Sequence, residues 1–326
     1  MSPVLSHPGP DLEYRPGMPA VDKPLIGLAL GSGSARGWAH IGVIRALAEA
    51  GVQPDIVCGT SIGALVGAAY ASGDLDRLET WVRGLTLPKV ASYFDLSLGG
   101  GVIKGAKLIE FFRGHTPDRD ITALPLPFAA VATDLASGRE VWLREGKVLE
   151  AVRASIAVPG LFTPARHDGR WLVDGGLVNP VPVSLCRAMG AEIVIAVDLN
   201  ADIIGRRLRR RGTPATRDQA RAPEGRPDQL LRRVQDSFAN LQLPWSWREA
   251  GDGPPSLFDT LATSLNIMQV HIARSRLAGE PPELLVTPQL ADLQLLGFHR
   301  AAEAIDEGRS AAQAMLPALR AAGLAA

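Results

Sequence analysis

Ser61 lies at the centre of a Gly-x-Ser-x-Gly pattern whose glycines are Gly59 and Gly63. Residues 56–58 predict the end of a buried strand, and residues 62–71 predict a closely packed helix of small and apolar residues. The two glycines allow a strand-to-helix turn sharp enough to present the serine side chain beyond the sheet edge. The start of the helix favours negative charge that develops there. Ser61 is therefore a candidate nucleophile, and the alternative is a serine that only caps the helix.

A serine nucleophile needs a base, and Asp174 is the strongest candidate. It ends a short predicted strand at 171–173, and the next two residues are Gly175 and Gly176, which let backbone and substrate approach closely. Sites in parallel sheets are assembled at the carboxyl ends of the strands. A partly buried carboxylate that contacts the serine hydroxyl can serve as its base. The alternative is an aspartate that only forms a turn before two glycines.

The six histidines offer no comparable base. In an α/β-hydrolase the catalytic histidine follows the serine and the acid, late in the chain and on a loop. His299 is the only late candidate at the edge of a loop, and it starts an alanine-rich helix. His40 lies on a predicted helix, where a packed or supporting role is favoured over catalysis. No group of His, Cys and carboxylate residues has metal-ligand spacing, so we expect neither a metal nor a cofactor.

A glycine-rich loop, Gly-Ser-Gly-Ser-Ala-Arg-Gly, follows the first predicted strand at 24–30. A dinucleotide site is disfavoured because the glycine spacing differs from G-x-G-x-x-G, and the Walker lysine is missing. A loop of backbone N–H groups without large side chains is instead suited to hold an oxyanion. The candidate oxyanion-hole residues are Gly31, Ser32, Gly33, Ser34, Arg36 and Gly37.

Alternating strands and helices must position these groups. Strands are predicted at 24–30, 56–58, 127–133, 171–173, 193–197 and 283–286, and at 141–143, which pairs with 127–133 through a turn. Helices are predicted at 38–50, 62–72, 74–85, near 105–114, and at 147–157, 180–189, 257–277 and 298–319. This alternation predicts an α/β fold whose mainly parallel sheet is covered on both faces.

Composition excludes several classes of protein. The chain is 46% hydrophobic and 21% charged, as in ordinary soluble proteins. Its 34 basic and 34 acidic residues give zero net charge, so no overall field attracts nucleic acid, and we expect no nucleic-acid partner. No secretory signal and no run of 18 apolar residues occurs, so we expect a cytoplasmic protein. Cys58 and Cys186 are predicted to be buried small hydrophobes.

We expect residues 1–22, with five prolines, to form a flexible arm before a single domain at 23–326. Ten arginines and three acids between Arg206 and Arg233 predict a disordered insertion at 204–228, and residues 257–326 predict a mainly helical end. These arginines, with Trp245 and Trp247, could bind the protein peripherally to the anionic inner face of a membrane. The alternative is a solvated loop with packed tryptophans.

Four blocks, taken in order, resemble those of the bacterial patatin-like phospholipases. They are residues 31–37, residues 59–63, Ala154-Ser155 with Pro159, Phe162 and Pro164, and Asp174-Gly175-Gly176. The runs at 38–42, 132–135 and 264–268 (Ser-Leu-Asn-Ile-Met) also look like bacterial members. Four ordered blocks are far more specific than any one of them. The resemblance spans roughly residues 24–200.

The resemblance implies a three-layer α/β/α fold and a serine esterase that cleaves acyl esters of phospholipids or lysophospholipids. It further implies a Ser–Asp dyad without histidine, in which Ser61 attacks the carbonyl and Asp174 takes its proton. The N–H groups of Gly33, Ser34 and their neighbours would hold the oxyanion, while Arg36 orients the loop or meets a phosphate.

Two other functions remain open. One is a patatin-fold protein that binds or regulates with little turnover, because fold alone does not establish activity. The other is an esterase that uses a histidine. The chain also departs from the family pattern, because Ser32 and Ser34 replace glycines of the fuller Gly-Gly-Gly-Gly form, which leaves the oxyanion donors open.

Overall fold

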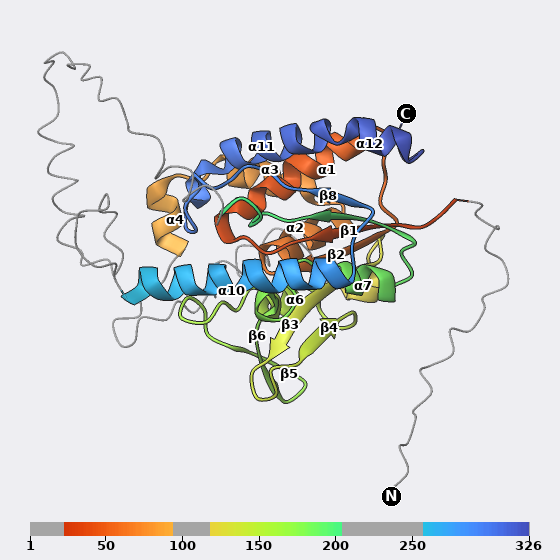
Figure 1. The fold of residues 1–326 in the computed structure, drawn as a ribbon. Coiled ribbons are helices and arrows are strands. Elements are labelled where there is room, and N and C mark those ends of the chain that lie inside the picture. Colours follow the sequence, from red (N-terminus) through yellow and green to blue (C-terminus); the bar gives the residue numbers. More distant parts are fainter. Residues whose placement is uncertain (1–22, 94–117, 204–256, 326) are drawn as a thin grey trace, which may run out of the picture.

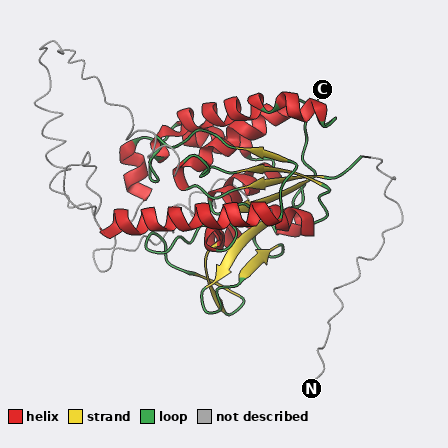
Figure 2. Cartoon of the chain, in the orientation of Figure 1, coloured by secondary structure: helices red, strands yellow, loops and turns green. Residues whose placement is uncertain are grey.

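The computed structural model describes residues 23–93, 118–203 and 257–325. Four predicted features lie outside the described residues: the arm at 1–22, the helix near 105–114, the insertion at 204–228, and the segment with Trp245 and Trp247. In the described part, helices cover both faces of an eight-stranded sheet (Figures 1 and 2). This arrangement confirms the predicted three-layer α/β/α fold.

The described strands form one sheet in the order β5-β6-β3-β2-β1-β7-β8, and β4 pairs with β3 off this path. The strands from β3 to β8 along this order are parallel. The pairings β3–β4, β3–β6 and β5–β6 are antiparallel. The strands are β1 (Ile26–Leu30), β2 (Ile56–Thr60), β3 (Phe128–Asp134), β4 (Glu140–Leu143), β5 (Ala165–His167), β6 (Arg170–Asp174), β7 (Ile193–Val197) and β8 (Leu284–Val286).

The central strands are apolar throughout because both of their faces are buried. Leu28 and Leu30 of β1 point into one hydrophobic core, and Ala29 between them points into the other. The first core is shared with α1, α2, α6 and α11, and the second with α7 and α10. The helices are α1 (Ala39–Glu49), α2 (Ile62–Ala71), α3 (Leu75–Arg83), α4 (Leu87–Tyr93), α6 (Val148–Ser155), α7 (Val183–Ala188), α10 (Leu257–Gly279), α11 (Ala301–Ala314) and α12 (Leu316–Ala321). None of the helices in the described part is long and apolar enough to cross a membrane.

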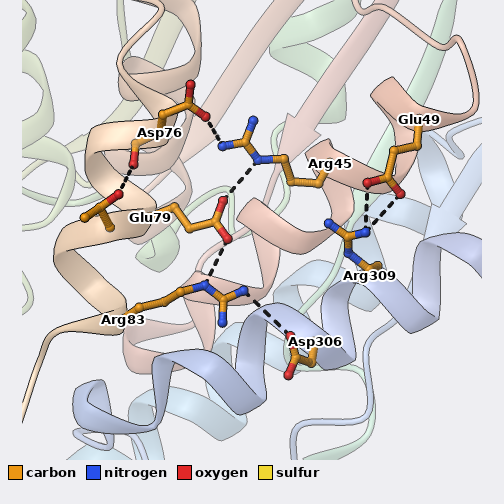
Figure 3. Close-up of polar contacts among 8 residues, drawn as sticks. Arg45, Glu49, Asp76, Glu79, Arg83, Asp306 and Arg309 are labelled. Carbon is orange, nitrogen blue, oxygen red and sulfur yellow. Dashed lines mark hydrogen bonds and ion pairs between the residues drawn. The ribbon is translucent and has the colours of Figure 1, made fainter.

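Helices α1 and α11 lie side by side with their backbones in contact (Figure 1). A Cβ at Gly42 would lie 1.8 Å from the Ile305 carbonyl oxygen, and one at Gly308 would lie 2.0 Å from that of Ala39. Ion pairs at the edges connect α1, α3 and α11 to one another, and one further pair lies within α3 (Figure 3). They are Arg45–Asp76, Arg45–Glu79 (3.0 Å), Arg83–Glu79 (3.0 Å), Arg83–Asp306 (3.7 Å) and Arg309–Glu49 (2.8 Å). This packing fixes α1, which directly follows the glycine-rich loop.

The end of the chain corrects one prediction. The sequence predicted a single helix over 298–319, whereas the structure has a 3-10 turn, η4 (Phe298–Arg300), then α11, and then α12 as a separate helix. Pro317 lies at the start of α12. Proline has no N–H to continue the helix before it and is favoured in the first turn of a new one. The long helix therefore breaks at Met315.

The register of β3 brings two distant strand ends together. Thr60, the last residue of β2, lies opposite Val131, and Asp174, the last residue of β6, lies opposite Ala132. The strands β2 and β6 run in opposite directions, because β2 is parallel and β6 antiparallel to β3. Their ends therefore meet at neighbouring residues of β3, and the residue after Thr60 is Ser61.

Candidate active site

Ser61 occupies a strained turn between β2 and α2. Its backbone has φ 58° and ψ −124°, a conformation that L-residues rarely adopt. A Cβ at Gly59 would lie 2.4 Å from the backbone of Ala64, and one at Gly63 would lie 2.2 Å from the carbonyl oxygen of Leu30. Both positions therefore require glycine. The structure thus has the sharp strand-to-helix turn that the Gly-x-Ser-x-Gly pattern predicted.

Ser61 and Asp174 lie in direct contact. The Ser61 Oγ donates a hydrogen bond to Asp174 Oδ2 at 2.5 Å, and the Gly176 N–H donates to Oδ1 at 2.7 Å. Ser61 is 6% exposed and Asp174 is 1% exposed. Burial raises the pKa of Asp174 to about 6, although the hydrogen bonds from Ser61 and Gly176 oppose the shift. The carboxylate is thus more basic than an ordinary aspartate.

The end of α6 holds both residues through their backbones. The N–H of Ser61 donates to Ser155 Oγ at 2.8 Å, and that hydroxyl donates to the Val131 carbonyl at 2.6 Å. Two residues later, the Ala157 carbonyl accepts the N–H of Asp174 at 2.9 Å. Sequence analysis placed Ser155 in a family block but assigned it no contact. Pro159 of the same block lies exposed in the turn after α6.

The glycine-rich loop uses its first two N–H groups to hold itself in place. Gly31 donates to the Val197 carbonyl at 3.0 Å, and Ser32 donates to that of Pro180 at 2.8 Å. Among the described residues, no hydrogen bond is formed by the N–H groups of Gly33 and Ser34. Of the six residues predicted for an oxyanion hole, these two therefore have backbone donors that remain available, whereas those of Gly31 and Ser32 are occupied.

Arg36 and His40 support the loop from inside the protein. Arg36 lies in the 3-10 helix η1 (Ser34–Trp38) and is 3% exposed. Burial lowers its pKa to about 10, and the charges of Asp202 and Asp198 oppose this shift. The His40 Nε2 lies 2.7 Å from the Gly31 carbonyl oxygen. Burial lowers the pKa of His40 to about 4 against the effect of this hydrogen bond, so at neutral pH the uncharged ring donates to Gly31.

Helix α10 contributes a side chain that the sequence analysis did not assign. The Gln269 Oε1 accepts a hydrogen bond from Ser32 Oγ at 3.2 Å. A Cβ at Gly176 would lie 2.6 Å from Gln269 Nε2, so this amide packs closely against the turn after Asp174. On the other side, Asn200 Nδ2 donates to the Ser32 carbonyl at 3.1 Å. Gln269 thus joins the glycine-rich loop to the turn after Asp174. In the sequence, only the preceding run at 264–268 resembled the family, and Gln269 itself was not assigned a role.

Several remaining predictions concern residues away from this cluster. His299 lies in η4, and neither Ser61 nor Asp174 forms a hydrogen bond to it in the described part. Cys58 and Cys186 are buried, as predicted. In the described residues, no three or more His, Cys, Asp and Glu side chains are grouped so as to hold a metal ion.

Comparisons with known proteins find a matching family and several related chains. A family model described as patatin-like phospholipase matches residues 28–187. A Mycobacterium tuberculosis protein named as an uncharacterized NTE family protein is 34% identical over 332 residues, 90% of this chain and 92% of that protein. A second such protein is 31% identical over 98% of this chain and 51% of that protein. Mouse patatin-like phospholipase domain-containing protein 7 is 37% identical over 188 residues, 54% of this chain and 14% of that protein.

Proposed function

The chain belongs to the patatin-like phospholipase family, and from this we propose that it is a serine esterase that hydrolyses acyl esters of phospholipids or lysophospholipids through a Ser61–Asp174 dyad. The family supports lipid-hydrolysing activity in general. The observation that carries the proposal is the hydrogen bond from Ser61 Oγ to a buried carboxylate of raised pKa.

The first step is attack on the ester carbonyl. Asp174 accepts the proton of the Ser61 hydroxyl as Oγ bonds to the carbonyl carbon. The proton then passes to the departing alkoxide oxygen of the lysolipid or glycerol group, which leaves an acyl-serine. In the second step Asp174 takes a proton from water, the hydroxide attacks the acyl group, and the Ser61 oxygen is released as the hydroxyl. The raised pKa makes Asp174 a better proton acceptor than an ordinary aspartate.

The negative oxygen of each tetrahedral intermediate needs hydrogen-bond donors. The N–H groups of Gly33 and Ser34 form no hydrogen bond to any described residue, whereas those of Gly31 and Ser32 bind carbonyl groups. Ile62 supplies a third donor, since it is the first residue of α2 and its N–H has no partner within the helix. The residue after the nucleophile has this role in other serine esterases with the same turn. His40 and Asn200 hold the loop through the carbonyls of Gly31 and Ser32.

Labelling with a fluorophosphonate probe, followed by peptide mapping and a lipid panel, tests this function. The wild type should be labelled at Ser61, and Ser61→Ala should lose labelling and essentially all hydrolysis while its melting temperature changes little. Ser72→Ala, at the end of the same helix, is the matched control and should keep both. Labelling that persists in Ser61→Ala would reject Ser61 as the nucleophile.

The two alternatives give different results in the same assays. A binding or regulatory protein with little turnover would remain unlabelled in its folded wild-type form, and would hydrolyse no member of the lipid panel. An esterase that uses a histidine would lose activity in His299→Ala, whereas the Ser–Asp dyad predicts a rate within a few fold of the wild type.

A further inference from the structure

The outer face of α10 carries exposed apolar side chains. Leu261, Ile267 and Met268 are 53%, 46% and 48% exposed, and they are three of the eight exposed large hydrophobic residues in the described part of the chain. Val270 and Ala273, on the side of the helix toward the sheet, are 1% and 2% exposed. Large side chains are usually arranged the other way round on a surface helix, with apolar groups inward. The outer face of α10 is therefore suited to contact an apolar partner.

The charged residues of α10 are unevenly distributed along it. Asp259 lies in its first turn, and from residue 260 to Gly279 the charged residues are Arg274 and Arg276. Arg276 is paired with Glu140 at 2.7 Å, whereas His271 and Arg274 lie on the exposed side. Apolar side chains beside cationic ones, on a helix too polar to cross a bilayer, are typical of helices that lie in the headgroup region. The complementary partner is apolar and negatively charged.

The opposite side of α10 reaches the candidate active site. Met268 points outward, and the next residue, Gln269, bonds to Ser32 and packs against Gly176. Figure 1 shows α10 as a long helix across the outside of the molecule, and it shares a hydrophobic core with α7. A surface that touched Met268 would thus lie about one helix diameter, ~10 Å, from the loops around Ser61.

We propose that Leu261, Ile267 and Met268, together with Arg274, form a docking surface for an anionic phospholipid bilayer. This inference rests on the proposed function as a lipid esterase, since it brings the substrate layer to the site. A second copy of the chain fits less well, because stable protein interfaces use about 20–30 residues a side and this surface offers three apolar side chains. Reversible contact with a bilayer needs only such a small apolar face with a cation beside it.

Vesicle co-sedimentation with the full chain tests the proposal. All proteins carry Ser61→Ala, so that the lipid stays intact and binding is read apart from turnover. The test variant adds Leu261→Ser, Ile267→Ser and Met268→Ser, and the control adds Leu135→Ser, because Leu135 is 54% exposed but lies after β3. Vesicles contain phosphatidylcholine alone or with phosphatidylglycerol. Hydrolysis of a water-soluble short-chain ester is measured in the same variants with Ser61 restored.

The proposal predicts tighter binding to the anionic vesicles, and binding by the triple variant roughly tenfold to a hundredfold weaker, from the apolar area lost. The Leu135 control should bind as its parent does, and the triple variant should hydrolyse the soluble ester at the parental rate. Equal binding by the triple variant and its parent overturns the docking surface, as does loss of binding in the Leu135 control alone. A dimer that dissociates in the triple variant without a change in vesicle binding assigns the face to a second copy instead. An inactive wild type that still binds through α10 would reject the esterase but not the surface.

Discussion

The Ser61 hydroxyl and the Asp174 carboxylate are 113 residues apart in the chain, yet they share a 2.5 Å hydrogen bond in a buried setting. No histidine takes part in this hydrogen bond in the described residues. The carboxylate is therefore placed where a histidine would stand in an ordinary serine hydrolase. Four predictions follow from the geometry around this pair.

The rate of ester hydrolysis should rise with pH and level off above about pH 6. Asp174 acts as a base only when ionised, and burial raises its pKa to about 6. Below that value kcat/KM should fall tenfold per pH unit. Asp174→Asn should lower the plateau by ~10² to 10⁴ and remove the inflection. A variant with near-normal turnover, or a wild-type profile that is flat between pH 5 and 7, would contradict the dyad.

The contribution of the Asp174 carboxyl to the free energy of unfolding should fall as the pH rises, whereas the rate of hydrolysis should increase. The folded pKa of Asp174 lies above the ordinary aspartate value of 3.8, so the folded state holds its proton more tightly than the unfolded chain does. The contribution of this group is largest below about pH 4 and is lost as pH rises through about 6, a change on the order of 3 kcal/mol. Asp174→Asn does not titrate here. Its melting temperature relative to the wild type should therefore rise from pH 4.5 to pH 7.5, and a constant difference would contradict the raised pKa.

Ser155→Ala should lower kcat more than it changes KM. The variant leaves the buried N–H of Ser61 and the Val131 carbonyl without their shared hydroxyl partner. A nucleophile displaced by about 1 Å can cost a hundredfold in rate. Slower fluorophosphonate labelling should accompany the loss, and Ser155→Thr, which keeps a hydroxyl, should recover part of it. A lower melting temperature with unchanged kcat would assign Ser155 to stability alone.

Gly63→Ala should destabilise the protein by about 3 kcal/mol or more and abolish hydrolysis, because overpacking of this severity displaces backbone. The new Cβ would lie 2.2 Å from the Leu30 carbonyl oxygen and 2.7 Å from that of Gly31. Gly67→Ala is the matched control on the same helix, since its nearest neighbour is a side-chain atom, Val57 Cγ1 at 3.1 Å, and not a backbone atom. Denaturant unfolding and ester hydrolysis should separate the two. Equal stability of both variants would mean that the turn at Ser61 tolerates a side chain at Gly63.

Sequence analysis predicted most of the strands and helices because their patterns are local. The strand at 193–197 and the pairing of 141–143 with β3 are confirmed. The break at Met315 was missed because alanine-rich residues on both sides of Pro317 favour a helix. The three-residue strand β5 was missed because its sequence is too short for any alternation to stand out.

The site was predicted less completely, because many of its contacts join residues that are far apart in the sequence. Ser61 and Asp174 carry strong local signals in their flanking glycines. Nothing in the loop sequence distinguishes Gly31 from Gly33, because the difference lies in their partners. The Gly31 N–H reaches Val197 on a neighbouring strand, and the Ser32 N–H reaches Pro180 before α7. Ser155 and Gln269 likewise depend on contacts with residues 94 and 237 positions away.

The ends of β2 and β6 meet at Val131 and Ala132 of β3. This register determines where insertions and deletions can occur without loss of the site. Side chains alternate between the faces of a sheet, so a slip of one residue reverses which face each of them occupies. A single deletion inside β6 would place the wrong residue opposite Ala132 and turn the carboxylate away from Ser61, even if the fold survived. Point substitutions elsewhere in these strands leave that alignment intact. Insertions and deletions should therefore be rejected in β2, β3 and β6, whatever residues they add or remove, and tolerated in loops that lie away from Ser61 and Asp174.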